Sequence, residues 1–285
     1  MLIIGERINA TRKRIRSAIL RRDADFIGQE ARKQSVAGAD YIDANAGIEP
    51  EREPEDLKWL VQTIQSEADC PVSLDSTNVE ALRAALPAHK GAPMVNSITG
   101  ESGRHEAVLP LVKEHNALVV ALTIGPKGMP TNVEERLEAA RGIVDLLRPH
   151  DIALDRVYFD PIIYAAATDG NAGRIALETV RALKSEFPEA HVTCGLSNIS
   201  FGLPRRNVLN RTFLPMLLSA GLDSAIIDPM EPHMMAAVLA AEAILGRDEF
   251  CMNYITAERA GNLGGGAKPA ETESGAYATE SHDAV

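Results

Sequence analysis

Short, continuously apolar runs alternate along the chain with longer stretches in which apolar residues follow helical spacing. The run 118–122 is apolar throughout, as strands buried on both faces of a parallel sheet are. Leu57, Leu60, Val61 and Ile64 follow the i, i+3, i+4, i+7 spacing of a helix with one buried face. The repeated order of strand, short connection and helix predicts a parallel sheet covered by helices.

Eight such pairs occur between residues 2 and 245. The predicted strands are 2–4, 41–43, 72–74, 94–96, 118–122, 157–159, 192–196 and 225–227. The predicted helices are 26–37, one beginning at Pro54, 79–88, 104–116, 132–147, 173–187, one carrying Leu209 to Leu217, and 234–245. This count predicts an α/β fold of the closed (β/α)8 TIM-barrel type, which usually takes about 250 residues.

An open, doubly wound sheet is the alternative fold, and it would carry a glycine-rich phosphate loop after its first strand. The residues at that point are Gly5-Glu6-Arg7-Ile8-Asn9, which form no such loop. Beyond residue 257 the periodic pattern stops, and a segment rich in Gly, Ala, Glu, Ser and Thr follows. We therefore expect one barrel domain over residues 1–256 and a mobile, disordered tail over 257–285.

Charge and composition exclude several classes of protein. The net charge of −11 would repel a phosphate backbone, so we expect no nucleic-acid partner. No apolar run approaches the ~20 residues of a membrane helix, and no signal peptide precedes the first strand, so we expect a cytoplasmic protein without a membrane partner. The three cysteines are widely separated, which argues against a disulfide framework or a structural zinc.

Local basic clusters interrupt this acidic composition near the N-terminus. They comprise Arg12, Lys13, Arg14 and Arg16, followed by Arg21 and Arg22. We interpret them as solvated residues of a loop and a helix start, and the alternative is a site for a small anionic ligand or an acidic partner.

Polar side chains recur where the predicted strands end. They are Glu6, Asn9, Asp43, Asn45, Asp75, Asn96, Asp160, Asn198 and Asp228. Any one of them alone would be read as a helix N-cap. The strand ends of a barrel meet at its C-terminal face, where the active sites of this fold lie. The recurrence therefore favours a ligand site for Asp75, Asn96, Asp160 and Asn198 together.

These strand ends supply carboxylates and amides but no histidine, cysteine or lysine. The set is not a nucleophilic triad, and we expect no metal centre, although clustered carboxylates can hold Mg²⁺. A carboxylate accepts two parallel N–H groups, and it therefore matches the edge of a flat heterocycle such as a 2-aminopterin.

Six segments carry a resemblance to a known family. They are Gly5-Glu6-Arg7-Ile8-Asn9, Leu74-Asp75-Ser76-Thr77-Asn78, Asn96-Ser97, Asp160-Pro161, Gly195-Leu196-Ser197-Asn198-Ile199-Ser200 and Asn210-Arg211-Thr212-Phe213-Leu214. From Met1 to about Tyr254 the chain resembles the methyltetrahydrofolate:corrinoid protein methyltransferases. These are pterin-binding barrels related to the folate domain of cobalamin-dependent methionine synthase.

The resemblance implies exchange of a methyl group between nitrogen 5 of methyltetrahydrofolate and the cobalt of a cobalamin that a partner corrinoid protein carries. The residues it places at the pterin are Glu6, Asp75, Asn96, Asp160, Ser197 and Asn198. It further implies that Asn198 is the catalytic residue near nitrogen 5, that Arg206 meets the glutamate tail, and that the protein is a homodimer. No DxHxxG-type corrinoid signature is present, so the chain itself is expected not to hold cobalamin tightly.

One position departs from the pattern, because Phe201 stands where some corrinoid iron–sulfur protein methyltransferases have glutamine. Two other functions stay open at this stage. One is a dihydropteroate synthase-like pterin enzyme, although Gly195-Leu196-Ser197-Asn198 lacks the lysine that such enzymes use. The other is a folate-binding protein without catalysis. The direction of methyl transfer is not decided by the sequence.

Overall fold

The computed structural model describes residues 1–101 and 103–263. Eight parallel strands form one sheet in the order β7-β6-β5-β4-β3-β2-β1-β8. They are β1 (Leu2–Asn9), β2 (Tyr41–Asn45), β3 (Val72–Asp75), β4 (Met94–Thr99), β5 (Leu118–Leu122), β6 (Val157–Asp160), β7 (His191–Val192) and β8 (Ser224–Ile227).

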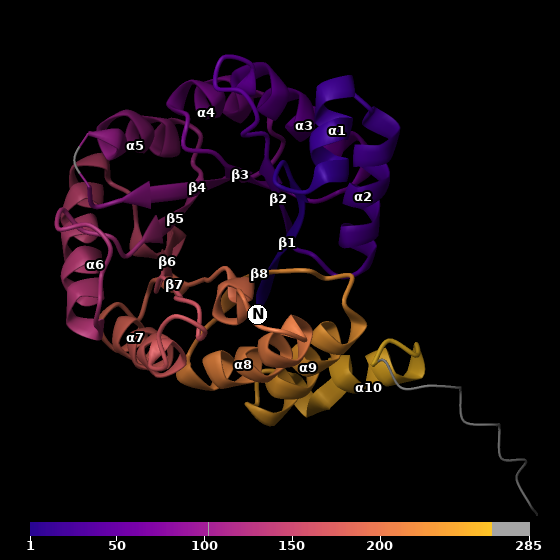
Figure 1. Cartoon of the computed structure of the whole chain (residues 1–285), viewed down its shortest axis with the longest axis vertical. Helices are drawn as coiled ribbons and strands as arrows, with labels where there is room; N and C mark the ends of the chain where they lie inside the picture. The colour runs from indigo at the N-terminus through magenta and orange to yellow at the C-terminus, as the bar shows by residue number, and fades with distance from the viewer. Residues whose placement is uncertain (102, 264–285) are drawn as a thin grey trace, which may run out of the picture.

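The sheet curls into a barrel (Figure 1). Its two edge strands are β7 and β8, and β8 also pairs with β1. A parallel bridge joins Gly195, just beyond β7, to Ile226 in β8, and the amide of Ile226 donates a 2.8 Å hydrogen bond to the carbonyl of Cys194. The α/β barrel prediction is thereby confirmed over the open-sheet alternative.

Helices surround the barrel (Figure 1). They are α1 (Lys13–Arg21), α2 (Ala24–Val36), α3 (Glu53–Glu67), α4 (Val79–Ala85), α5 (Arg104–Glu114), α6 (Val133–Leu147), α7 (Ala172–Glu186), α8 (Arg206–Ala220), α9 (Pro232–Ile244) and α10 (Met252–Arg259). No helix of residues 1–101 and 103–263 is both long and apolar enough to cross a membrane.

Two hydrophobic layers hold the barrel together. The larger one lies between strands and helices, and the smaller one fills the barrel interior with Ile4, Tyr41, Met94, Val120 and Tyr158. Four of these five residues, all except Val120, stand in the first half of their strands, so they close the N-terminal end of the barrel interior. The polar residues farther along the strands are left to line the opposite end.

Some elements differ from the prediction. β1 runs on to Asn9 with a register shift between Gly5 and Ile8, so Glu6 lies within the strand. β7 has only two residues, and a 3-10 helix (Leu196–Ser200) follows it, so the predicted strand over 192–196 is wrong. Ser197 and Asn198 consequently sit on a helical turn, where successive side chains are a third of a turn apart and do not alternate between opposite faces as in a strand.

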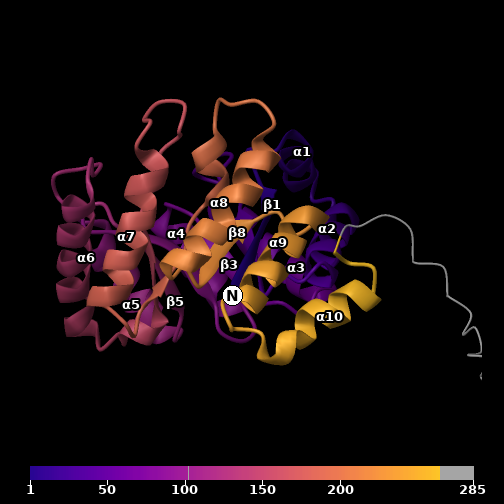
Figure 2. The same cartoon turned by 90° about the horizontal axis from the view of Figure 1, so that it is seen from below.

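The helices α1 and α10 were not predicted. Arg12 precedes α1, and Lys13, Arg14 and Arg16 lie in its first turns, so the interpretation of this cluster as a loop and a helix start is confirmed, whereas Arg21 and Arg22 lie at the end of the helix. α10 extends to Arg259, and the tail expected to be disordered lies outside the described residues from 264 onward. Figure 2 shows α1 and the loops that precede α7 and α8 at the same end of the barrel.

Candidate active site

Polar side chains from β2, β3 and β4 form one hydrogen-bonded group inside the barrel mouth. Asp43 is its centre, because its Oδ1 accepts a 2.7 Å hydrogen bond from Oγ of Ser73 and a 3.2 Å hydrogen bond from Nδ2 of Asn96. Asp43 is buried, and Asn96 is half-buried. Asn96, a predicted site residue, is thus oriented by a carboxylate two strands away.

Asp75 ends β3 beside this group. Nδ2 of Asn45 donates 3.1 Å hydrogen bonds to both the carbonyl oxygen and Oδ2 of Asp75. The turn that follows is held by Arg104, whose Nη2 donates a 2.7 Å hydrogen bond to the carbonyl of Ser76. Asp75 is therefore fixed by neighbouring strands and loops, and one of its carboxylate oxygens has no protein donor in the described part of the chain.

Burial raises the pKa of both carboxyl groups. The pKa of Asp43 rises to about 8, first because of burial and second because of the charge of Asp75. Burial also raises the pKa of Asp75, against the hydrogen bond from Asn45. At neutral pH Asp43 is consequently protonated for the most part, and it brings an O–H donor to a site otherwise rich in acceptors.

Asp160 ends β6 on the far side of the mouth. Burial raises its pKa to about 6, although the amides of Ile162 and Gly195 and the charge of Arg136 counteract burial. The amide of Ile162 donates a 2.8 Å hydrogen bond to Oδ1 of Asp160. Asp160 is therefore a carboxylate at neutral pH and a neutral acid a little below it.

A buried arginine fixes the backbone just after Asp160. Arg136 on α6 donates from Nε to the carbonyl of Pro161 at 2.6 Å, from Nη1 to that of Asn132 at 2.9 Å, and from Nη2 to that of Ile162 at 2.9 Å. Its guanidinium also lies over the ring of Tyr164, 5.3 Å from the centroid. These contacts satisfy carbonyls that would otherwise be buried without donors, and they set the direction of the chain leaving β6.

The β7, β8 and β1 side of the mouth carries Glu6, Ser197 and Arg206 around a cavity of about 250 Å³. Burial raises the pKa of Glu6, while Arg12, whose Nη2 lies 3.5 Å from Oε1 of Glu6, counteracts it. Nη2 of Arg206 donates to the carbonyl of Ser197 at 2.6 Å, and Nε of Arg206 donates to Oγ of Ser200 at 3.0 Å. Arg206 thus braces the 3-10 helix as well as lining the cavity.

Asn198 is exposed on that 3-10 helix, and its amide side chain makes no hydrogen bond within residues 1–101 and 103–263. Even a β-carbon placed on Gly195 would make only a van der Waals contact with Nδ2 of Asn198, at 3.4 Å, so the backbone at Gly195 does not confine the amide. The amide is therefore able to reorient toward a ligand in the mouth.

The structure brings the predicted residues together at one end of the barrel, on two sides. Asp75 and Asn96 stand on one side, and Glu6, Ser197 and Arg206 stand on the other. Within the described residues, no three His, Cys, Asp or Glu side chains are arranged to hold a metal ion.

Sequence reasoning missed several residues of the site. Asp43 and Asn45 were noted at a strand end but not assigned to the site, although their spacing of two puts them on the same face of a strand. Arg136 and Thr123 carried no signal, because each is a single polar residue in an otherwise ordinary segment. Oγ1 of Thr123 donates a 2.8 Å hydrogen bond to the carbonyl of Asp160.

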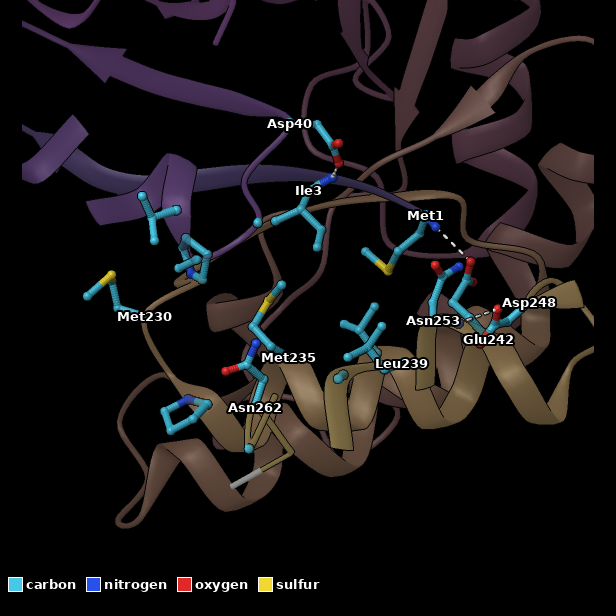
Figure 3. Close-up of a pocket in the computed structure, with 18 of the residues that line it drawn as sticks. Met1, Ile3, Asp40, Met230, Met235, Leu239, Glu242, Asp248, Asn253 and Asn262 are labelled. Carbon is cyan, nitrogen blue, oxygen red and sulfur yellow. Dashed lines mark hydrogen bonds and ion pairs between the residues drawn. The ribbon is translucent and has the colours of Figure 1, made fainter. Parts of the chain in front are cut away.

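A larger cavity of about 830 Å³ lies elsewhere, between the start of β1, the end of α2 and the helices α9 and α10 (Figure 3). Its walls are largely apolar, with Ile3, Met235 and Leu239 among them. The amino group of Met1 pairs with Glu242 at 2.7 Å on one wall. None of the strand-end residues of the mouth lines this cavity, so it is not the candidate active site.

Comparisons with known proteins place the chain among proteins that bind pterins. A family described as pterin binding enzyme matches residues 5–228. The methylcorrinoid:tetrahydrofolate methyltransferase of Eubacterium limosum is 36% identical over 266 residues, which cover 93% of this chain and 98% of that protein. The methionine synthase of Mycobacterium tuberculosis is 33% identical over 240 residues, and this chain spans about 20% of its length.

Solved structures show the same fold at lower identity. A dihydropteroate synthase of Yersinia pestis with a bound pterin–sulfa conjugate superposes with a TM-score of 0.66 at 15% identity, over 86% of this chain and 93% of that one. The 7,8-dihydropteroate synthase of Vibrio fischeri gives the same TM-score, identity and coverage.

Proposed function

Because the chain belongs to the pterin-binding enzyme family that includes the methylcorrinoid:tetrahydrofolate methyltransferase, we propose that it exchanges a methyl group between nitrogen 5 of methyltetrahydrofolate and the cobalt of a corrinoid protein. The observation that carries this proposal is the set of acceptors that Asp75, Asn96 and Asp160 present at the barrel mouth. Tetrahydrofolate is the other folate form of the same reaction, and the corrinoid belongs to a partner.

The acceptors suit the pterin ring. Because Nδ2 of Asn96 is used by Asp43, the atom that Asn96 offers to a ligand is its carbonyl oxygen. Asp160, ionised at neutral pH, and the less engaged oxygen of Asp75 add carboxylate acceptors. A 2-aminopterin has several N–H groups along one edge, and charge-assisted hydrogen bonds to them would set its orientation.

The reaction needs a donor near nitrogen 5, because a secondary amine anion is a poor leaving group without a hydrogen bond or proton. We assign this role to the unengaged amide of Asn198. A reduced corrinoid supplies the nucleophile for the methyl group. The remaining task of the chain is to hold the folate in line with the open mouth, where a partner has access.

Two alternatives remain beside this proposal. The likeness to dihydropteroate synthases rests on 15% identity, which establishes the fold alone, and Gly195-Leu196-Ser197-Asn198 has no lysine. A folate-binding protein without catalysis would use the same acceptors but would not exchange a methyl group. Turnover with p-aminobenzoate would support the first alternative, and tight folate binding without exchange would support the second.

The test is a pair of measurements on the purified protein. Isothermal titration should show binding of methyltetrahydrofolate, and stopped-flow absorbance should show loss of the Co(I) band when methyltetrahydrofolate is mixed with the protein and reduced corrinoid. Asp75→Ala and Asp160→Ala should weaken binding, whereas Asp69→Ala, on an exposed carboxylate away from the mouth, should not. Normal binding in both mouth variants would overturn the proposed site.

We further propose that the protein is a homodimer that pairs through α9 and α10. Ile244 and Phe250 are 85% and 83% exposed, and Met252, Tyr254 and Ile255 extend the same apolar face. Two copies with a net charge of −11 repel each other overall, so an isologous contact is most favourable where apolar side chains gather and where exposed charges of both signs, such as Arg247 and Glu249, allow pairing across the two-fold axis. The double variant Ile244→Glu/Phe250→Glu should be a monomer by sedimentation velocity. The control Met129→Glu, at an exposed residue elsewhere, should stay a dimer. A monomeric wild-type protein would contradict the proposal.

A further inference from the structure

Six cations stand on the rim of the barrel mouth, and we call them the basic rim. They are Arg12, Lys13, Arg14, Arg16, Arg205 and Arg206. The first four belong to the start of α1 and the residue before it; Arg205 is the N-cap of α8, and Arg206 is its first residue. In a chain with a net charge of −11, such a local concentration of positive charge indicates a site that attracts an anionic ligand.

Most of these cations have no carboxylate of their own. Lys13, Arg14, Arg16 and Arg205 form no ion pair within the described part of the chain, and all four are exposed. Some exposed cations elsewhere are paired, as Lys113 is with Asp151 and Lys127 with Glu138, whereas unpaired ones such as Lys90 and Arg181 stand apart from one another in the sequence and form no comparable cluster within the described residues. The rim therefore keeps a positive potential that intramolecular pairing does not cancel.

The position of the basic rim follows from the order of strands. β8 lies between β1 and the segment after β7, so the loop before α8 and the start of α1 flank the same side of the mouth. Figure 2 shows both at one end of the barrel. Asp75 and Asn96 come from β3 and β4, across the barrel. A folate whose pterin is held there extends the rest of its length toward Arg206 and the basic rim.

The carboxylates that line the cavity beside Arg206 do not cancel the positive charge of the basic rim along α1. Glu6 and Asp228 face the cavity beside Arg206, but Arg12 lies 3.5 Å from Glu6, and Nη1 of Arg7 lies 2.9 Å from Oδ2 of Asp228. Glu231 also lines that cavity. The innermost part is therefore close to neutral, and the positive excess begins at Lys13 and continues along α1.

A second cleft lies where that excess is greatest. It has a volume of about 340 Å³, and its walls include Lys13, Arg14, Arg21 and Ser17. Its single carboxylate belongs to Asp23, whose Oδ1 already accepts a hydrogen bond from the amide of Phe26. Nη2 of Arg21 lies 4.0 Å from Oδ2 of Asp23, so the cleft offers two unpaired cations, Lys13 and Arg14, and the hydroxyl of Ser17 to an anionic chain that arrives from the mouth.

We propose that the basic rim binds the additional glutamyl carboxylates of folates that carry a γ-linked polyglutamate tail. This inference rests on the proposed folate substrate and specifies that the substrate carries a polyglutamate tail. Each added glutamate brings one carboxylate at a regular spacing, which suits cations arranged from the mouth outward along α1. Each exposed carboxylate–cation pair contributes little alone, but several in one flexible chain add together.

The experiment compares methyltetrahydrofolate monoglutamate with the triglutamate by isothermal titration, at about 50 mM and about 500 mM salt. We expect the triglutamate to bind roughly tenfold tighter at low salt and the preference to shrink at high salt. In Lys13→Ala/Arg14→Ala/Arg16→Ala the ratio of the two dissociation constants should fall to about one. The control Lys90→Ala/Arg148→Ala/Arg181→Ala removes the same charge from exposed positions away from the basic rim and should keep the wild-type ratio.

The outcomes separate this inference from the proposed function. If the wild-type protein binds neither folate, the proposed function itself is wrong. If it binds both equally at low salt, only the basic-rim inference is overturned. A triple variant that keeps the triglutamate preference but slows methyl exchange with a corrinoid protein would assign the basic rim to the partner and overturn the inference.

Discussion

Nδ2 of Asn96 donates a 3.2 Å hydrogen bond to Oδ1 of Asp43, and this contact connects strands β4 and β2 across β3. The contact decides which end of the Asn96 amide faces the barrel mouth, since the amino group is taken and the carbonyl oxygen is left. It also lies next to the Asp43 carboxyl group, whose pKa is raised to about 8. One pair of residues thus connects ligand orientation with the protonation of the site.

Asp43→Asn should stabilise the protein at alkaline pH. The pKa of Asp43 in the folded protein, about 8, lies above its ordinary value of 3.8, so ionisation disfavours folding and wild-type stability falls as pH rises through that window. Asparagine cannot ionise and still accepts from Ser73. We expect the stability difference between the variant and the wild type to grow by up to about 4 kcal/mol between pH 5 and pH 9, at about 1.4 kcal/mol per pH unit up to the pKa of Asp43. Urea unfolding at pH 5 and pH 9 measures the free energy of unfolding of the variant and of the wild type. Asp69→Asn is the control, and an equal effect of both substitutions would contradict the prediction.

Folate affinity should weaken as the pH falls through about 6. Asp160, with a pKa of about 6, accepts pterin N–H groups most strongly when ionised, so the charge-assisted hydrogen bonds are present above that pH and weaken below it. Asp160→Asn should bind folate more weakly at pH 8, by roughly 1.5–3 kcal/mol, and should lose this part of the pH dependence. Titrations of both proteins from pH 5 to pH 8 measure the difference, and parallel curves would show that another group is responsible.

Asn198→Ala should slow methyl transfer more than it weakens folate binding. An interaction that strengthens as nitrogen 5 gains electron density affects the rate of chemistry more than ground-state affinity. Asp75→Ala provides the comparison, because its hydrogen bonds exist in both states and its loss should chiefly reduce affinity. Binding by titration and single-turnover stopped-flow rates separate the two effects. A normal transfer rate in Asn198→Ala would leave that residue without a catalytic role.

Arg136→Met should destabilise the protein and weaken folate binding together. The substitution leaves the carbonyls of Pro161 and Ile162 without donors, at a cost of about 2–4 kcal/mol. It also frees the backbone that supplies the Ile162 amide to Asp160. Arg141→Met, which removes an exposed arginine from the same helix, should cost less than about 1 kcal/mol. Thermal unfolding and folate titration of both variants measure this, and similar losses in the two would refute the bracing role.

Much of the fold was predictable because local patterns carry it. Runs such as Leu118–Leu122 can only be buried strands, and their alternation with amphipathic helices leads to a barrel. The strand-end positions of Asp75 and Asp160 follow from the same pattern, since a polar residue directly after a buried strand lies at the C-terminal face. The exceptions include β7, α1 and α10, where two paired residues and helices of nine and eight residues gave too short a pattern.

The sequence by itself determined the barrel, the end at which its polar residues gather and the acceptor character of that group. Only the tertiary structure decided that Asp43 is buried beside Asp75, that Asn96 turns its carbonyl oxygen to the mouth, and that Arg136 braces the backbone behind Asp160. The physical reason is the distance along the chain over which the interactions act. Periodicity reflects contacts within one element, whereas desolvation, charge and hydrogen-bond direction depend on residues from other strands and helices, which the chain brings together only when the barrel closes.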